Sequence, residues 1–256
     1  SVEEPVVLRV AYENKTQFPN YLGHTQKVLP RPGAAVELVK LLEQRIPGLE
    51  VRFSRYPWKR CLAMLETGQV DGIFNASFSP ERTGIGRYPQ IGPDVDTSRR
   101  LTTISYHLYA YPDTLLGWDG QAFQEPGLEI AAPLGYSIVK DLEDMGVSVV
   151  SVRSSMQSLQ LLVARRVHAV ALQDVTGDFL LRKHPKELAG VERIEPPLRT
   201  KPYYLMLSRQ FQAAHPELSE RIWDAIGDLR EEKLAALADA YLSDEGALIK
   251  SISEFE

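Results

Sequence analysis

The sequence predicts an α/β fold made of two consecutive units that helices close at the C-terminal end. Strand-like and helix-like runs alternate along most of the 256 residues. The strand-like runs are short and apolar, beginning with residues 6–12, as in strands that are buried on both faces. The alternation starts again after about residue 100, which predicts a second unit of the same kind.

The first 75 residues predict one β-α-β-α-β unit. Strands are expected at residues 6–12, 49–53 and 70–74, and helices at residues 34–46 and 58–65. Pro32 and Gly33 mark the start of the first helix, and Gly68 follows the second. Because crossovers between parallel strands are right-handed, we expect these strands to be largely parallel.

The rest of the chain repeats the pattern and then changes to helices. Strands are expected at residues 101–111, 128–132, 147–152, 167–172 and 203–207, and helices at residues 135–145, 155–166, 216–230 and 232–242. Residues 195–197, Glu-Pro-Pro, predict a break in the chain direction. Open α/β sheets bind ligands beyond the carboxyl ends of their strands, here at Glu13, residues 75–79, residues 133–137 and residues 173–174.

One of these strand ends has the composition of an anion site. After Ile73 and Phe74 the chain becomes small and polar, and Ser79-Pro80-Glu81 has the pattern of a helix start, with Ser79 as N-cap. A helix start offers free backbone N–H groups, and Arg82 adds a fork of donors. This combination predicts a site for a carboxylate.

Composition excludes several other classes of protein. The net charge of −5 does not favour nucleic-acid binding, and no apolar run approaches the ~18 residues of a membrane span. The five histidines have no metal-ligand spacing, so neither a metal nor another cofactor is expected. Cys61 is the only cysteine and lies near Leu62 and Leu65, which predicts an inert, buried thiol. Residues 1–5 do not form a signal peptide and do not begin with Met, so we expect a periplasmic chain whose leader has been removed.

The order and spacing of these segments resemble a known family. The matching segments are Leu8-Arg9-Val10-Ala11, residues 68–72, Ser77-Phe78-Ser79-Pro80-Glu81-Arg82, residues 135–137, residues 166–174 and residues 232–242. Together they resemble the type II periplasmic solute-binding proteins of the amino-acid-binding family 3. The resemblance implies a two-lobed Venus-flytrap fold with two crossover hinge strands. Lobe 1 would comprise residues 1–105 plus 201–256, and lobe 2 residues 106–200.

The resemblance also implies roles for individual residues. Arg82 matches the arginine that pairs with the ligand α-carboxylate, although an exposed arginine at a helix start is the alternative. Ser79 would offer its backbone N–H to the same carboxylate, Ser77 would accept from the α-ammonium, and Asn75 stands where the family often has Ser or Gly. Asp174 matches the acid that binds the α-ammonium from the other lobe. Its alternative is the N-cap of a helix over residues 175–181.

Further positions would line the ligand site. Tyr136 and Ser137 match the helix start of lobe 2 that donates N–H groups to the carboxylate. Trp58 matches a pocket wall but would also suit the core, and Glu13 matches an acid that binds cationic side chains but would also suit a solvated loop. Phe18 and Tyr21 lie in a first loop with unusual spacing, where they either cover the ligand or pack on the lobe.

The function implied by the resemblance is an extracytoplasmic binding protein, not an enzyme. A monomer would clamp an amino acid or related carboxylate and present it to a membrane permease for ABC-type uptake. One alternative is the ligand-binding sensor domain of a membrane signalling protein. Another is an enzyme resembling an arogenate or prephenate dehydratase, which would need a general acid such as Glu13 or Asp174.

Overall fold

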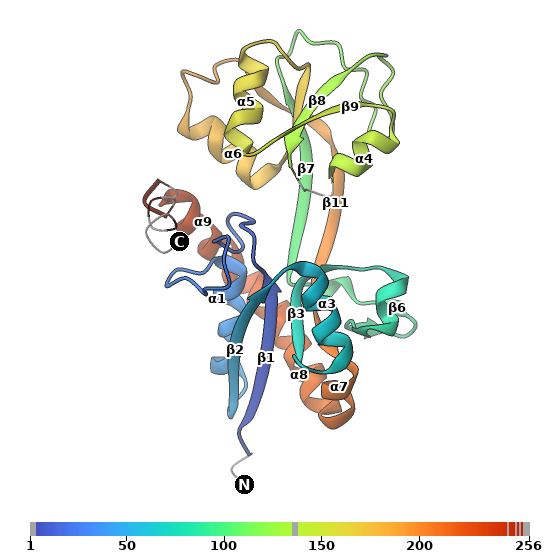
Figure 1. The fold of residues 1–256 in the computed structure, drawn as a ribbon, viewed down its shortest axis with the longest axis vertical. Helices are drawn as coiled ribbons and strands as arrows, with labels where there is room; N and C mark the ends of the chain where they lie inside the picture. Colours follow the sequence, from blue (N-terminus) through green and yellow to red (C-terminus); the bar gives the residue numbers. More distant parts are fainter. Residues whose placement is uncertain (1–3, 135–137, 245, 249, 251, 253–256) are drawn as a thin grey trace. The chain divides into compact units, whose positions relative to one another are not determined.

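The computed structural model describes residues 4–134, 138–244, 246–248, 250 and 252. The chain divides into two compact units, one of Ser1–Thr103 with Pro202–Glu256 and one of Ile104–Lys201 (Figure 1). Two strands, β7 (Thr102–Ala110) and β11 (Glu192–Ser208), run from one unit into the other. The predicted α/β class is confirmed in both units.

In unit 1 four strands form the sheet in the order β2 (Leu49–Tyr56), β1 (Val6–Glu13), β3 (Gly72–Ser77) and β11, and β4 (Gly86–Arg87) also pairs with β11. Strand β1 is parallel to both β2 and β3, as the right-handed crossovers predict, whereas β11 is antiparallel to β3. A separate hairpin joins β5 (Gln90–Ile91) and β6 (Asp94–Val95).

Helices cover both faces of this sheet. They are α1 (Ala34–Lys40), α2 (Leu42–Arg45), α3 (Trp58–Thr67), α7 (Arg209–Ala214), α8 (Pro216–Leu229) and α9 (Ala235–Ser243), with short turns η1 (Pro80–Gly84), η2 (Thr97–Arg99) and η3 (Arg230–Leu234). Alternate residues of a strand serve opposite faces. Thus Val10 packs with α1 and α8, and Ala11 packs with α3. Burial on both faces explains why the strands are nearly continuous apolar runs.

Gly33 joins the loop after β1 to helix α1. Its φ of 128° lies in a region that side chains with a Cβ rarely adopt, and a Cβ would lie 2.3 Å from the carbonyl oxygen of Asn20. Glycine is therefore required at this helix start, as the Pro-Gly pattern predicted.

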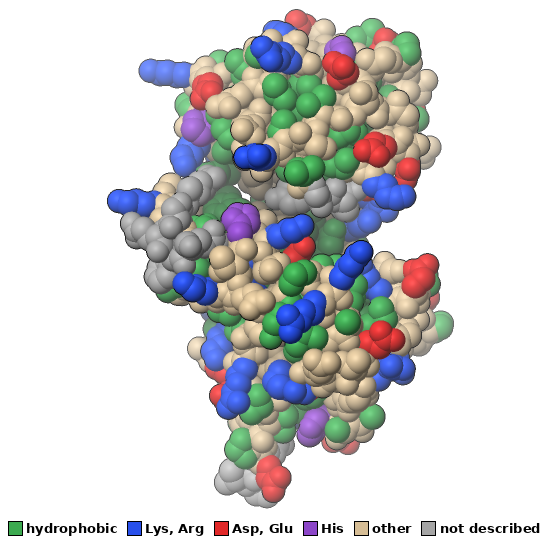
Figure 2. Space-filling model, in the orientation of Figure 1, with side chains coloured by type: hydrophobic (Ala, Val, Ile, Leu, Met, Phe, Trp, Pro, Cys, Tyr) green, Lys and Arg blue, Asp and Glu red, His purple; other side chains and the backbone are tan. Residues whose placement is uncertain are grey.

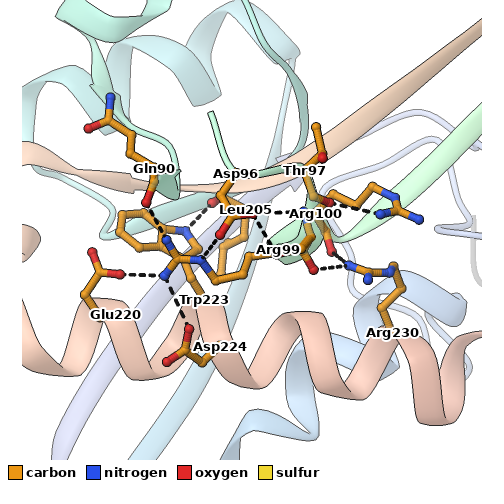
Figure 3. Close-up of polar contacts among 11 residues, drawn as sticks. Gln90, Asp96, Thr97, Arg99, Arg100, Leu205, Glu220, Trp223, Asp224 and Arg230 are labelled. Atoms are coloured by element: carbon orange, nitrogen blue, oxygen red, sulfur yellow. Dashed lines mark hydrogen bonds and ion pairs between the residues drawn. The ribbon is translucent and has the colours of Figure 1, made fainter. Parts of the chain in front are cut away.

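Arg99 ties the segment before β7 to helix α8 (Figure 3). Its Nε donates to Asp96 at 2.8 Å and its Nη2 donates to the carbonyl oxygen of Gln90 at 2.8 Å. The guanidinium also pairs with Glu220 of α8 and lies 5.9 Å from the ring centroid of Trp223. The start of β7 is thereby fixed within unit 1.

Unit 2 contains a sheet in the order β7, β10 (Ala169–Gln173), β8 (Glu129–Pro133) and β9 (Ser148–Val152). Strands β8, β9 and β10 are parallel, and β7 is antiparallel to β10. Helices α5 (Ser155–Val163) and α6 (Asp174–Lys183) pack on β10 in one apolar cluster. Leu159 of α5, Leu172 of β10 and Leu180 of α6 belong to it. Helix α4 (Ile138–Asp144) adds the buried Ile138 and Leu142.

Three sequence predictions about the fold are wrong in detail. No break occurs at residues 195–197, because β11 continues through them. Strand β11 pairs with β3 from Tyr203 to Leu207, and Pro196 lies before this stretch and is exposed, where a residue without an N–H is tolerated. The helix expected at 34–46 is divided at Leu41, and helix α7 was not predicted, although Ser208 caps it by accepting from Phe211 N at 2.9 Å.

Basic side chains are scattered over the visible face of unit 1 although the net charge is −5 (Figure 2). Several basic side chains of unit 1 are paired: Arg45 with Glu232, Lys40 with Glu43, and Arg52 with Glu50. Exposed pairs of this kind contribute little to stability. Within the described residues, no helix combines the length and the apolar character needed to cross a membrane.

Candidate functional site

The candidate residues lie at the carboxyl ends of parallel strands in both units. Glu13, Asn75, Ser77, Ser79, Trp58 and Arg82 belong to unit 1, and Asp174 belongs to unit 2. Tyr136 and Ser137 lie outside the described residues. The described candidate residues of each unit therefore form a separate set.

Arg82 lies in η1 and is held by the end of β3. Its Nη1 donates to the carbonyl oxygen of Ser77 at 3.0 Å and to the Ser77 hydroxyl at 3.2 Å. The Trp58 ring centroid is 5.7 Å from the guanidinium carbon. Among the described residues no carboxylate lies within ion-pair distance of Arg82, so this half-buried cation is unpaired in unit 1.

Ser77 lies at the end of β3 as expected, but its acceptors have partners within unit 1. Its carbonyl oxygen accepts from Arg82 and also from the Tyr88 hydroxyl at 2.8 Å. The carbonyl and hydroxyl oxygens of Ser77, either of which could accept from a ligand ammonium, both accept hydrogen bonds from side chains of unit 1. Ser77 and Tyr88 instead orient the Arg82 guanidinium, a role that the sequence analysis missed for Tyr88.

The expected helix start at Ser79 is only partly correct. A helical segment does begin at Pro80, but it is a five-residue 3₁₀ turn, and Gly84 is its last residue. Ser79 is in the N-cap position, yet its hydroxyl binds the Glu81 carboxylate and caps no backbone N–H. Because such a short turn has little dipole, the attraction for an anion depends mainly on Arg82.

Asn75 is buried, with 7% of its surface exposed. Its Oδ1 accepts from Thr102 Oγ1 at 2.6 Å and its Nδ2 donates to Gln17 Oε1 at 3.0 Å. The side chain thus links β3 to β7 and to the first loop within unit 1. Gln17 is a polar neighbour that the sequence analysis did not single out.

Glu13 ends β1 and is half-buried. Burial raises the pKa of its carboxyl group, against the opposing effects of Lys15, a hydrogen bond with Tyr21, and Arg55. A carboxyl group that is desolvated in this way is a plausible partner for a cation. The alternative of a solvated loop acid therefore fits neither its place in β1 nor its half-buried environment.

The first loop is held by Arg55, which is 1% exposed and lies over the Tyr12 ring at 4.8 Å. Its guanidinium donates to the carbonyl oxygens of Leu22 at 2.7 Å and Gly23 at 2.8 Å, and also to that of Glu13 at 3.0 Å. A basic residue with carbonyl partners far away in the sequence gives no local signal. The sequence analysis consequently missed it.

The aromatic candidates of unit 1 have core contacts. Tyr21 is 4% exposed and packs edge-on against Tyr12 and Phe74, and Phe18 packs against the cluster around Leu22 and Tyr241. For these two residues the packing alternative describes the structure. Trp58 packs partly on the cluster of Cys61, as its core alternative describes, and also borders Arg82, so its place in a pocket wall stays a prediction.

Asp174 is the first residue of helix α6, with its side chain 29% exposed. Its Oδ1 accepts from the backbone N–H of Val175 at 2.7 Å, and Gln173, not Asp174, occupies the N-cap position. Burial raises the pKa of the Asp174 carboxyl group, and Asp178 acts in the same direction. The Val175 N–H and His107 oppose this rise.

A charged network surrounds Asp174, and the sequence analysis did not anticipate it. His107 of β7 lies between Asp174 and Glu195, and Tyr109 donates to Asp178 at 2.8 Å. Gly177 permits this contact, because a Cβ there would lie 2.2 Å from the Tyr109 ring. The network fixes the first turn of α6 against β7.

Neither a metal centre nor a reactive thiol emerges from the described residues. Within them no group of three or more His, Cys, Asp and Glu side chains could hold a metal ion. Burial raises the pKa of the Cys61 thiol to about 12, which keeps it protonated. Cys61 is therefore a structural residue, as its apolar neighbours predicted.

Comparison with solved structures identifies the fold. An ancestral cationic amino acid solute-binding protein (AncCDT-1) superposes with a TM-score of 0.64 at 14% identity, covering 92% of this chain and 95% of the other. The GluR0 ligand-binding core in complex with L-glutamate gives 0.63 at 15% identity, covering 93% and 98%. A histidine kinase sensor domain with similarity to periplasmic binding proteins gives 0.58 at 18% identity, covering 94% and 97%.

Sequence comparison adds nothing to this result, since neither protein-family models nor curated sequences give a match. The structural matches extend over more than nine-tenths of this chain and nearly all of each neighbour. The two strands that run between two α/β units agree with this assignment. The chain thus has the two-lobed fold of the type II periplasmic binding proteins.

Proposed function

We propose that the protein is an extracytoplasmic solute-binding protein that clamps an amino acid or a related small carboxylate between two lobes. Unit 1 would be one lobe and unit 2 the other. The observation that carries this proposal is the unpaired guanidinium of Arg82, which Ser77 orients at the end of β3. A half-buried arginine beside a strand end is a suitable partner for a carboxylate, which it binds through two parallel hydrogen bonds.

The second charge of the ligand would be met by unit 2. Asp174 lies at the end of β10, where burial makes its charge costly. An ammonium group would offset this cost, so an α-amino acid suits both charges better than a simple acid does. Because the two charges belong to different units, the ligand itself would stabilise the closed state. An affinity of roughly micromolar, about −8 kcal/mol, is within reach of two desolvated charge pairs.

The testing experiment is a thermal-shift screen of the protein against the common amino acids, polyamines and small carboxylic acids. A ligand that binds only the folded state raises the melting temperature. Calorimetry then compares wild type with Arg82→Ala for the best ligand. We expect the dissociation constant to rise at least a hundredfold, about 3 kcal/mol, because the carboxylate loses its partner.

Arg209→Ala is the matched control, because Arg209 is exposed at the start of α7, outside the candidate site. It should bind like wild type. Equal affinity of Arg82→Ala and wild type would refute the carboxylate assignment, and the lack of any ligand in the screen would refute the binding role.

A membrane permease that recognises the closed form would complete ABC-type uptake, with the protein acting as a periplasmic monomer. The histidine kinase sensor domain among the structural neighbours favours a second candidate, the sensor domain of a membrane signalling protein. The reading frame beyond Glu256 separates the two: a membrane span there supports the sensor, and a stop codon supports the transport protein.

We propose binding without catalysis, since two of the neighbours are described as a solute-binding protein and a ligand-binding core. An enzyme of the dehydratase type would need a general acid above the leaving hydroxyl group. Formation of phenylalanine from arogenate, followed by chromatography, tests that alternative. Product formation would replace the binding role with a catalytic one.

A further inference from the structure

His107 is a buried histidine that faces two carboxylates within unit 2. Its side chain is 7% exposed. Its Nε2 lies 3.2 Å from Glu195 Oε2, and its Nδ1 lies 3.9 Å from Asp174 Oδ2. Nδ1 is fully buried and has no hydrogen-bond partner among the described residues. A buried ring nitrogen that points toward a candidate ligand residue calls for an explanation.

The contact with Glu195 determines where the first proton of the ring lies. An ionised carboxylate can only accept, so Nε2 carries a hydrogen and donates to Glu195. In the neutral imidazole, Nδ1 would then direct a lone pair toward the Asp174 oxygen, which is repulsive. A second proton on Nδ1 turns this repulsion into attraction. The geometry therefore favours a second proton on the His107 ring while Asp174 is ionised.

The charges around the ring point the same way. Asp174 faces it from α6 and Glu195 from β11, and the charges of Asp178 and Arg193 act on Asp174. Arg193 pairs with both Asp178 and Glu195, at 2.6 Å and 3.2 Å. Three carboxylates thus share a single arginine, and among the described residues His107 is the only basic group within ion-pair distance of Asp174.

We propose that His107 is a positioning residue for Asp174, and that a cation which binds Asp174 displaces the second proton of the imidazole ring. This inference rests on the proposed function, because it takes Asp174 as the ammonium-binding residue. A ligand ammonium supplies the positive charge that the His107 proton supplies in the free protein. The two compete, so ligand binding releases a proton from His107 to solvent.

The expected consequence is an affinity that depends on pH, because the ligand and a proton compete. At pH 6 the ammonium must replace a proton or tolerate a cationic ring beside it. A higher pH disfavours this competing proton by mass action. By linkage, affinity rises with pH in the wild type and changes little once His107 is replaced.

Calorimetry tests this with the ligand found in the screen. Titrations in buffers of different ionisation enthalpy count the protons released on binding. For wild type we expect a fraction of a proton released between pH 6 and pH 8 and an affinity gain of about fivefold. His107→Gln should release none and show equal affinity at both pH values. The matched control His168→Gln removes an exposed histidine of unit 2 and should behave like wild type.

Equal proton release by His107→Gln and wild type would overturn the proposal, as would no release by wild type. If no ligand binds at all, the proposed function fails, and a measurement on the free protein still decides the His107 assignment. Imidazole NMR at pH 6, with the His107 signal identified by its loss in His107→Gln, reports the protonated fraction of the ring. Asp174→Asn should lower this fraction severalfold. An unchanged fraction would refute the claim that Asp174 favours the second proton on the His107 ring.

Discussion

The guanidinium of Arg82 is anchored to Ser77 through a single nitrogen, with Nη1 at 3.0 Å from the carbonyl oxygen and 3.2 Å from the hydroxyl oxygen. This anchoring fixes the plane of the group while no carboxylate of the described residues neutralises it. An oriented and unpaired arginine is what a carboxylate ligand requires, since planar pairing depends on the orientation of the fork.

Arg82→Lys tests whether orientation matters beyond charge. Lysine keeps the positive charge but cannot form two parallel hydrogen bonds. We expect the dissociation constant for the ligand to rise about tenfold or more, measured by calorimetry, while the melting temperature of the free protein stays the same. Ser77→Ala is the comparison variant. It removes the hydroxyl but keeps the carbonyl contact, so its loss should be smaller than that of Arg82→Lys, and the reverse order would contradict this role of Ser77.

Asp174→Asn should separate stability from binding. The pKa of Asp174 is raised on folding, so the ionised form is less favourable in the folded state than in the unfolded state. Stability from this group is full below the unfolded pKa and is lost as the pH rises through the folded pKa. Asparagine removes that loss, so the free variant should melt at a higher temperature than wild type at pH 7 but not at pH 3.

The same variant should bind the ligand at least tenfold more weakly, because the ammonium loses its counter-charge. Asp178→Asn is the control for stability, since Asp178 pairs with Arg193 and accepts from Tyr109. Its replacement should lower the melting temperature. A lower melting temperature for Asp174→Asn at pH 7 would show that its contact with the Val175 N–H outweighs its desolvation.

Arg55 provides the test of how the first loop is held. Arg55→Met leaves the carbonyl oxygens of Glu13, Leu22 and Gly23 without their buried donor. We expect a loss of about 3 kcal/mol in the free energy of unfolding, measured by urea denaturation. Arg52→Met on the same strand removes only an exposed pair with Glu50 and should cost less than about 0.5 kcal/mol. Similar losses for both variants would rule out this role for Arg55.

The contrast between Arg82 and Arg55 shows what could be predicted from the sequence. The strand ends, and with them Glu13, Ser77 and Asp174, follow from local apolar patterns and turn residues, so their positions in the fold were predictable. Arg55 and His107 act through partners that are 28 to 88 residues away, and no local pattern contains that information. Such partners become visible only when the strands are paired.

The length of a helical segment could not be predicted for the same reason, because it depends on contacts with distant residues. Ser79-Pro80-Glu81 correctly predicted a helical start, but the turn reaches only Gly84 and buries none of its residues. Without an apolar face to bury, an α-helix there has little to stabilise it. The continuity of β11 through Pro196 likewise depends on which side of the strand is open, and composition cannot supply this.

Cys61 should be unreactive in the folded protein. It is 0% exposed, and burial raises the pKa of its thiol to about 12, so the nucleophilic thiolate is scarce at pH 8. We expect a thiol reagent such as DTNB to label less than a tenth of the protein in buffer within an hour, and all of it in 6 M guanidinium chloride. Rapid labelling of the folded protein would show that α3 opens readily.

Arg99→Met tests the attachment of the segment before β7 to helix α8 (Figure 3). The side chain is only 13% exposed and contacts Asp96, Glu220 and the Gln90 carbonyl group. Its removal takes one donor from the Asp96 carboxylate, which keeps Ser98, and removes the Arg99 donor of the Gln90 carbonyl group. This should cost about 2 kcal/mol of unfolding free energy. For a domain of this size that lowers the melting temperature by about 4–8 °C.

Glu220→Gln keeps the Asp96 and Gln90 contacts and, because Glu220 is half exposed, should cost less than about 0.5 kcal/mol. Tryptophan fluorescence during urea unfolding follows both variants, since Trp223 packs beneath Arg99, and equal losses would mean that the exposed pair with Glu220, not the buried contacts, holds this segment.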